Sequence, residues 1–307
     1  MAPLQPEGGL AAAEVAFYGP ALLISTYIVF RHGLRGQLGW LYLVTLSILR
    51  LVGGSATLWS ETQNDYSPAV LETAFITSAV GTAPLLLVLL GFLERVNDRI
   101  TVGGVGKWVF RGIHLLSITA LVLAIIGGTD IADRSASSRS TGHTLLQAGS
   151  VIFLAIYLAL AAITILTFRR KGDAQPGDWK LIDAGLAALP FLLVRILYTV
   201  IVAFAKEGSV FYFSDVDVYV SAFMQFLMEA FVVVIFIVAG LLTPKQDKEG
   251  RGQREIGSVD LERAGGRGPM RSEDAGAGSK VEWGERRQRS AWDYRPSKLI
   301  SDAISGR

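Results

Sequence analysis

The sequence predicts an all-α protein: a seven-helix transmembrane bundle with its N-terminus outside and a disordered cytoplasmic C-terminal tail. Three observations predict this class. Hydrophobic residues make up 51% of the 307 residues and charged residues 18%, and the mean hydropathy of +0.42 is too high for a soluble globular chain. Seven apolar stretches reach the ~20 residues that a membrane-spanning helix needs. Lys and Arg gather in alternate loops, as expected for a chain that crosses a membrane repeatedly.

The predicted spans follow one another along the chain with short polar loops between them. They cover residues 14–31, 38–59, 68–93, 107–128, 143–168, 181–205 and 217–242. Residues 1–13 form the predicted outer N-terminus, which contains no Lys or Arg and so lacks the basic region of a cleaved signal peptide. We therefore expect the first span to be retained.

The predicted orientation rests on the Lys and Arg residues of the loops. Nine lie in the first, third and fifth loops: Arg31, Arg35, Arg95, Arg99, Lys107, Arg169, Arg170, Lys171 and Lys180. Three lie on the opposite side: Arg134, Arg139 and Lys206. Cytoplasmic loops carry the excess of basic residues, so the N-terminus is predicted to be outside. Aromatic residues near span ends are expected to form interfacial belts: Tyr18, Trp40, Trp59, Trp108 and Trp179.

Four charged residues stand out inside the predicted spans, where a charge costs ~3 kcal/mol unless it finds a partner or water. At ~1.5 Å per residue, Arg50 lies ~13 Å, Glu72 ~6 Å, Arg195 ~15 Å and Glu229 ~18 Å below the outer ends of their spans. All four therefore fall in the outer half of the membrane. Further polar candidates in the spans are Gln147, Tyr198 and Gln225.

Two interpretations of these charges are open. In the first, Arg195 pairs with Glu229 and Arg50 reaches Glu72 by snorkelling, and the pairs only fix helix register. In the second, the same groups line a polar pocket that opens to the outside and bind a ligand or a transported solute.

Several chemistries have no support in the sequence. Residues 217–242 contain no lysine for a retinal Schiff base, and His32, His114 and His143 are too scattered to hold haem or zinc. Cysteine is absent. We therefore expect no enzymatic activity, no catalytic residue, no metal site and no cofactor.

The predicted tail, residues 243–307, holds 14 of the 29 Lys and Arg and 11 of the 27 Asp and Glu. It is rich in Gly, Ser and charged residues, a composition typical of disorder. The overall net charge of +2 averages two unlike parts and gives no argument for nucleic-acid binding.

Four segments give the chain a family resemblance: "GWLYLVTLSILRLVGG", "SAVGTAPLLLVLLGFLERV", "LPFLLVRILYTV" and "MEAFVVVIFIVAGLL". They resemble a family of uncharacterised fungal membrane proteins, a seven-helix domain of unknown function, over about residues 14–242. The topology is also similar to fungal lipid-translocating exporters and to receptor-like seven-helix proteins. The resemblance implies architecture and a fungal source, and it supplies no activity.

The sequence leaves two function classes open for a protein of the plasma membrane or an endomembrane. The first is binding and translocation of a small amphipathic or anionic molecule, or a lipid, at the polar site. A weak parallel similarity between the second and sixth spans, "ILRL" and "VRIL", favours this class. The second is a receptor or sensor that signals through a cytoplasmic partner of unknown identity.

Overall fold

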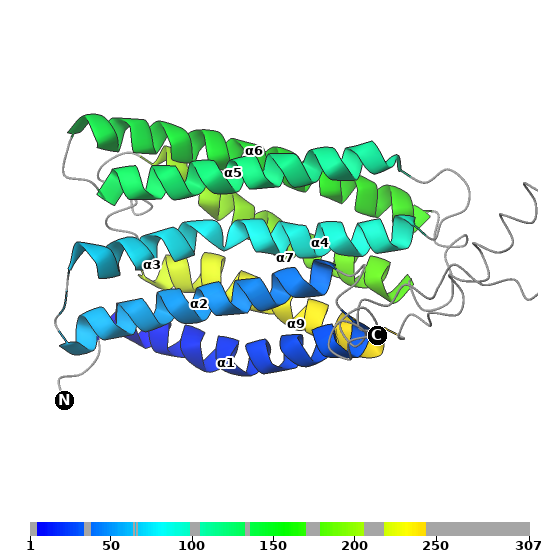
Figure 1. Ribbon diagram of the computed structural model, residues 1–307, viewed down its shortest axis with the longest axis horizontal. Coiled ribbons are helices and arrows are strands. Elements are labelled where there is room, and N and C mark those ends of the chain that lie inside the picture. Colours follow the sequence, from blue (N-terminus) through cyan, green and yellow to red (C-terminus); the bar gives the residue numbers. More distant parts are fainter. Residues whose placement is uncertain are drawn as a thin grey trace, which may run out of the picture. The chain divides into compact units, whose positions relative to one another are not determined.

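The computed structural model describes residues 5–33, 38–63, 65, 67–98, 105–132, 136–169, 179–205 and 218–243. All regular elements in these ranges are helical (Figure 1). They are α1 (Pro6–His32), α2 (Leu38–Gln63), α3 (Pro68–Val80), α4 (Thr82–Asn97), α5 (Lys107–Ala132), α6 (Ala136–Arg169), α7 (Trp179–Phe204), α8 (Val218–Ser221), the π-helical η2 (Ala222–Leu227) and α9 (Met228–Leu242).

Seven helical runs among the described residues are long and apolar enough to cross a membrane. The third run joins α3 to α4, and the seventh joins α8, η2 and α9. The predicted all-α bundle of seven spans is therefore confirmed. The predicted disordered tail, residues 243–307, lies outside the described residues apart from Thr243.

The first helix is longer than the sequence analysis expected. It begins at Pro6 rather than near residue 14. Proline is favourable at the first helical position because the N–H that it lacks has no partner there, and the alanine-rich stretch that follows favours helix. Residues 6–13 of the predicted outer N-terminus thus form about the first two turns of α1.

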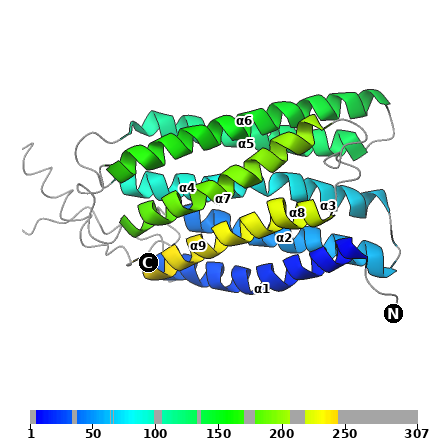
Figure 2. The same cartoon turned by 180° about the vertical axis from the view of Figure 1, so that it is seen from behind.

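Six spans and α3 surround the remaining helix, α4. The order of neighbours around the ring is α1, α2, α3, α5, α6, α7 and α9, and α9 returns to α1 (Figures 1 and 2). Every residue from Thr82 to Leu90 is buried, because α4 is apolar all round and contacts α2, α5, α6 and α7. The third span therefore passes from the ring into the centre of the bundle.

A break in the helix at Gly81 allows the third span to pass from the ring into the centre of the bundle. Pro84 has no N–H to donate to the carbonyl of Val80, one turn earlier, so the α-helical hydrogen bonding cannot continue through this point. α3 ends at Val80 and α4 begins at Thr82, with Gly81 between them in a right-handed helical conformation.

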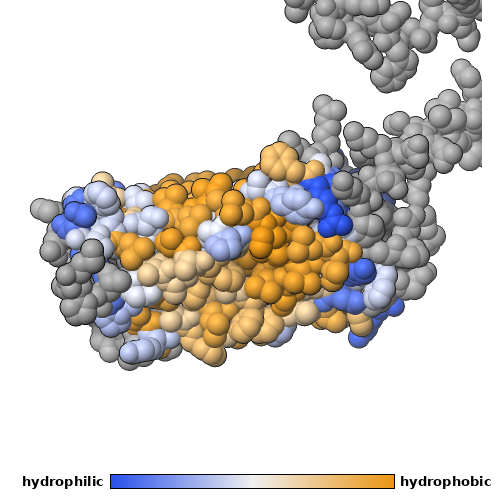
Figure 3. Space-filling model, turned by 90° about the horizontal axis from the view of Figure 1, so that it is seen from below, coloured by the Kyte–Doolittle hydropathy of each residue, from blue (hydrophilic) through white to orange (hydrophobic). Residues whose placement is uncertain are grey.

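One face of the bundle carries an apolar band between two more polar ends (Figure 3). Large apolar side chains of α1 such as Leu23 and Phe30 are exposed, as lipid contact requires. We call the end where α1 begins the N-terminal end. The other, the basic end, carries Arg31, Arg95, Lys107, Arg169 and Lys180 and is the predicted cytoplasmic side.

The aromatic-belt prediction is right for three of its five residues. Trp59, Trp108 and Trp179 are exposed near helix ends. Trp40 is buried instead, where it stacks on His32 with ring centroids 5.5 Å apart and contacts Phe92. Tyr18 is also buried, because the early start of α1 places it in the middle of the helix.

Close contact between α5 and α6 depends on two glycines near the N-terminal end. A Cβ atom at Gly142 would lie 2.8 Å from the carbonyl oxygen of Gly127 and 2.9 Å from the backbone nitrogen of Ile131. Both obstacles are backbone atoms, so no side-chain rotation relieves the clash. Small residues serve in this way to bring membrane helices together.

We predict that Gly142→Val destabilises the bundle by about 1–3 kcal/mol, because the added atoms force α5 and α6 apart. Gly112→Ala is the matched control, since a Cβ atom at Gly112 of α5 meets nothing within 4 Å. Thermal unfolding in a maltoside detergent measures both variants. A Gly142→Val protein that melts with the parent would contradict the role given to this contact.

Candidate functional site

A buried ionic cluster lies at the middle of the bundle, centred on Glu229 of α9. The Glu229 carboxylate accepts hydrogen bonds from Arg50 Nε at 2.6 Å and Arg50 Nη2 at 2.5 Å. It also accepts one from the Tyr18 hydroxyl at 2.7 Å and one from Arg195 Nε at 3.3 Å. All four side chains are buried, and Glu229 is 0% exposed. One carboxylate therefore links α1, α2 and α7 to α9.

These residues meet because they lie at the same depth. At ~1.5 Å per residue, each is ~14–20 Å from the end of its span that lies at the N-terminal end of the bundle. A charged group at this depth is poorly solvated, so hydrogen bonds from neighbouring helices are needed to stabilise it. Four hydrogen bonds converge on the two oxygens of Glu229, which satisfies the acceptor sites of a carboxylate.

The two arginines are bound to Glu229 very differently. Arg50 makes a two-pronged contact with both carboxylate oxygens, the strong geometry for a guanidinium–carboxylate pair. Arg195 makes one longer bond to Glu229, donates from Nη1 to the Thr199 hydroxyl at 2.8 Å, and lies 5.9 Å from the ring centre of Tyr198. Among the described residues, its Nη2 has no hydrogen-bond partner. Arg50 is therefore the structural partner of Glu229, and Arg195 is the less constrained cation.

The break at Gly81 makes room for Arg50. A Cβ atom at Gly81 would lie 2.8 Å from Arg50 Nη2 and 3.1 Å from its Cζ. Because both prongs of the guanidinium are held by Glu229, the side chain cannot move aside freely. The glycine thus lets the third span approach the cluster closely.

The cluster carries excess positive charge, because two guanidinium groups share one carboxylate. Glu14 of α1 is half-buried and lies within electrostatic reach of Arg50, Glu229 and Arg195. Glu14 makes no hydrogen bond or ion pair with another described residue. Its carboxylate therefore has no direct partner among the described residues.

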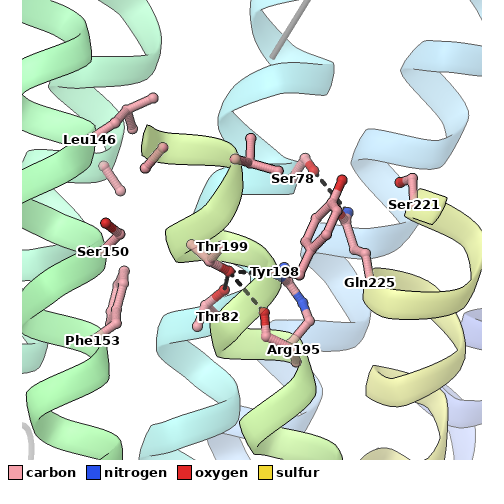
Figure 4. A pocket seen from close by; sticks show the side chains of 13 residues that line it. Ser78, Thr82, Leu146, Ser150, Phe153, Arg195, Tyr198, Thr199, Ser221 and Gln225 are labelled. Atoms are coloured by element: carbon pink, nitrogen blue, oxygen red, sulfur yellow. Dashed lines mark hydrogen bonds between the residues drawn. The ribbon is translucent and has the colours of Figure 1, made fainter. Parts of the chain in front are cut away.

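Two cavities lie in the N-terminal half of the bundle, one on each side of η2. The first, cavity 1, has a volume of about 190 Å³ (Figure 4). Its lining residues come from the third to seventh spans: Ser78, Thr82, Ala124, Leu146, Ser150, Phe153, Arg195, Tyr198, Thr199, Val202, Ala203, Ser221 and Gln225. Arg195 is the charged residue among them, and most of the walls are apolar.

The second, cavity 2, has a volume of about 290 Å³. It is lined by residues of the first, second, third and seventh spans: Glu7, Leu10, Ala11, Glu14, Leu49, Arg50, Gly53, Thr57, Ala74, Thr77, Ser78, Val218, Ser221 and Gln225. Arg50 and two carboxylates are its charged residues. Both cavities therefore border the ionic cluster from the N-terminal side.

The π-helical segment η2 stands between the two cavities. Gln225, at its centre, is buried and donates from Nε2 to the Ser78 hydroxyl at 2.9 Å. π-Helical turns are rare and occur mostly at functional sites. The segment contains Gln225 and ends two residues before Glu229, so it helps to set the positions of both side chains.

The structure gives a mixed outcome for the predicted site residues. Arg50, Arg195 and Glu229 come together, and Tyr198 and Gln225 line cavity 1 beside them. The predicted Arg195–Glu229 pair is present. The other predicted pair is wrong, because Arg50 binds Glu229 at its own depth instead of snorkelling to Glu72. Glu72 is half-buried in α3, lines neither cavity and makes no ion pair among the described residues.

Tyr18 and Glu14 belong to the site although the sequence pattern did not identify them as site residues. Gln147, one of the further polar candidates, is half-buried in α6 but lines neither cavity. One signal was available. Glu14 and Tyr18 are four residues apart and so share a helix face, which identifies them as candidates once α1 is known to begin at Pro6.

Together, the seven apolar helical runs and the charges sealed between them define a multi-pass membrane protein. The chain matches a family described as a domain of unknown function (DUF7702) over residues 4–246, and it belongs to that family. No curated protein matches it. The expected resemblance to a family of unknown function is thus confirmed, whereas the fungal source and the likeness to lipid exporters stay predictions.

We predict that Glu229→Leu destabilises the protein by about 3–5 kcal/mol, because it leaves two buried cations without a counter-charge. Arg50→Leu leaves Glu229 with the neutral Tyr18 hydroxyl and the longer bond from Arg195, and is also strongly destabilising. The double variant recovers much of the loss, since both buried charges of the strong pair disappear. Unfolding midpoints of the parent, the singles and the double form the cycle that measures this coupling.

Arg195→Leu supplies the comparison within the same cluster. It removes the excess positive charge, the longer bond to Glu229 and the hydrogen bond to Thr199, and it leaves the two-pronged Arg50–Glu229 contact in place, so its cost is smaller than that of Arg50→Leu. Equal losses for the two arginine variants would contradict the division of roles between them.

Proposed function

We propose that this protein binds a small amphipathic anion in cavity 1 through Arg195 and translocates it across the bilayer. The observation that carries the proposal is the incomplete hydrogen bonding of Arg195. Its buried guanidinium makes a single long bond to Glu229, and its Nη2 has no partner among the described residues. The same side chain lines a cavity whose walls are otherwise mostly apolar. A phosphate or carboxylate accepts charge-assisted hydrogen bonds from such a group. The apolar walls accept a hydrocarbon chain.

Two interrupted helices support translocation in particular. The third span is broken at Gly81, and Ser78 and Thr82 on its two sides line cavity 1. The seventh contains η2, and Gln225 within η2 lines both cavities. Transporter binding sites are commonly built on discontinuous helices of this kind, which have backbone groups and hinge points beside the ligand.

A receptor is the second candidate, and one observation favours it. All cavity-lining residues lie in the N-terminal half of the bundle, whereas aromatic side chains fill the core toward the basic end, with Phe92 contacting Trp40 at 4.4 Å and Phe236 at 5.1 Å between ring centres. A site reached from one side is what a sensor requires. In either case the proposed activity is binding without covalent chemistry, and the partners are the bilayer and the amphiphile. The proposed location is the plasma membrane or an endomembrane.

We predict that the parent binds hexyl phosphate and that Arg195→Gln weakens this binding about tenfold or more, because a charge-assisted hydrogen bond to the anion is lost. Isothermal titration calorimetry in a neutral maltoside detergent measures both. Arg111→Gln is the control: this arginine lies near the basic end of α5 over the Trp108 ring and lines neither cavity. Hexyl phosphate binding that is unchanged in Arg195→Gln would rule out Arg195 as the anion-binding group.

Single-cysteine labelling distinguishes translocation from sensing, and the cysteine-free parent gives it no background. Val233, one turn from Glu229 toward the basic end, is fully buried in this structure. For a transporter we expect Val233→Cys to react with a membrane-impermeant maleimide from the basic side when hexyl phosphate is present. A receptor predicts no such reaction. Leu242→Cys, exposed at the basic end, is the positive control for access from that side.

A further inference from the structure

The two cavities are separated by a thin partition of polar side chains. Ser78, Ser221 and Gln225 line both of them. The Gln225–Ser78 hydrogen bond closes part of this partition. A hydrogen bond between neutral side chains contributes only about 1 kcal/mol, so a ligand that replaces it can extend through both spaces.

The cavities carry opposite charge. In cavity 1 the charged lining residue is Arg195. In cavity 2 the charge of Arg50 is already neutralised by the two-pronged contact with Glu229, which leaves Glu7 and Glu14 as the uncompensated groups. Glu7 is exposed near the N-terminal end, whereas Glu14 is half-buried one or two turns deeper. An anion is therefore favoured on one side of the partition and a cation on the other.

Arg195 and Glu14 are complementary in a second respect. Each has hydrogen-bonding capacity that no described residue satisfies: the Nη2 group of Arg195 and the carboxylate of Glu14. They lie within electrostatic reach of each other, yet no direct ion pair joins them. A ligand with one anionic and one cationic group satisfies both without disturbing the bond between Arg50 and Glu229.

The walls of cavity 1 add a third requirement. Away from Arg195 they are largely apolar, with contributions from Leu146, Phe153 and Val202. Apolar surface of this kind gains free energy when it covers hydrocarbon instead of water. A ligand that occupies the whole space thus has an apolar chain as well as two charges.

We infer that the two cavities form one site for a zwitterionic amphiphile, whose anionic group binds Arg195 and whose ammonium group binds Glu14 across the Gln225–Ser78 partition. The inference rests on the proposed function and narrows its ligand class. The chemistry required is a phosphate ester that carries an ammonium group and a hydrocarbon chain. A phospholipid headgroup supplies the two charges in this order, and so does a soluble phosphate ester of an amino alcohol.

The test compares three probes on the full chain in a neutral maltoside detergent: hexylphosphocholine, hexyl phosphate and free phosphocholine. The parent is expected to bind hexylphosphocholine more tightly than either of the others. A parent that does not prefer hexylphosphocholine over hexyl phosphate overturns the inference, whatever the variants do. Free phosphocholine that binds as tightly as the hexyl ester overturns the amphiphilic part and indicates a soluble ligand.

The decisive variant is Glu14→Gln. It is expected to weaken hexylphosphocholine binding about tenfold, the effect of removing one charge-assisted contact, and to leave hexyl phosphate binding within about twofold. Glu14→Asp keeps the charge and is expected to keep the preference for the zwitterion. Glu72→Gln is the matched control, because it removes a half-buried carboxylate of α3 that lines neither cavity.

The outcomes separate the inference from the proposed function. If Glu14→Gln changes the binding of neither probe, or weakens both equally, the zwitterion assignment fails while the Arg195 site stands. If hexyl phosphate does not bind the parent, or binds Arg195→Gln as well as the parent, the proposed function itself fails.

Discussion

The shared carboxylate of Glu229 is the interaction on which the rest of the bundle depends. In the hydrocarbon region a charge without partners costs ~3 kcal/mol or more, so Arg50, Arg195 and Glu229 are tolerated only when their helices are assembled. Through Tyr18 the same carboxylate also holds α1. The hydrogen bonds thereby fix the relative register of four spans and close the ring where α9 meets α1.

The two irregular helices follow from this constraint. The third span must enter the centre of the bundle and also pass Arg50, and the break between Val80 and Thr82 with a glycine at the contact satisfies both needs. The π-helical η2 stands next to Glu229 in the seventh span. Regular helices leave little space between them, whereas these interruptions coincide with the walls of both cavities. The helix break at Gly81 and the π-helical η2, which accommodate the ionic cluster, thus also leave room for a ligand.

The sequence predicted the seven spans because hydropathy is a local property, and it predicted three members of the cluster because buried charges are conspicuous in apolar segments. The sequence-based prediction was wrong where the depth of a residue in the membrane depended on where its helix begins. A start of α1 near residue 14 places Tyr18 at the membrane surface. Because α1 begins at Pro6 instead, Tyr18 lies ~18 Å below the N-terminal end of the bundle, level with Glu229. The cavities depend on how seven helices pack together, which no local pattern encodes.

Arg50 and Arg195 contact Glu229 differently, and this difference connects the stability of the bundle with the proposed ligand binding. Arg50 occupies both oxygens of Glu229 and is anchored beside Gly81, so its loss opens the core. Arg195 links α7 to α9 by one long bond. In the proposed function, an anion in cavity 1 competes with Glu229 for that guanidinium and weakens the polar contact between α7 and α9, while Arg50 and Tyr18 keep Glu229 satisfied. Under this proposal, ligand binding changes the connection between two neighbouring spans without exposing an unpaired buried charge, which is the coupling that either a transporter or a receptor of this architecture needs.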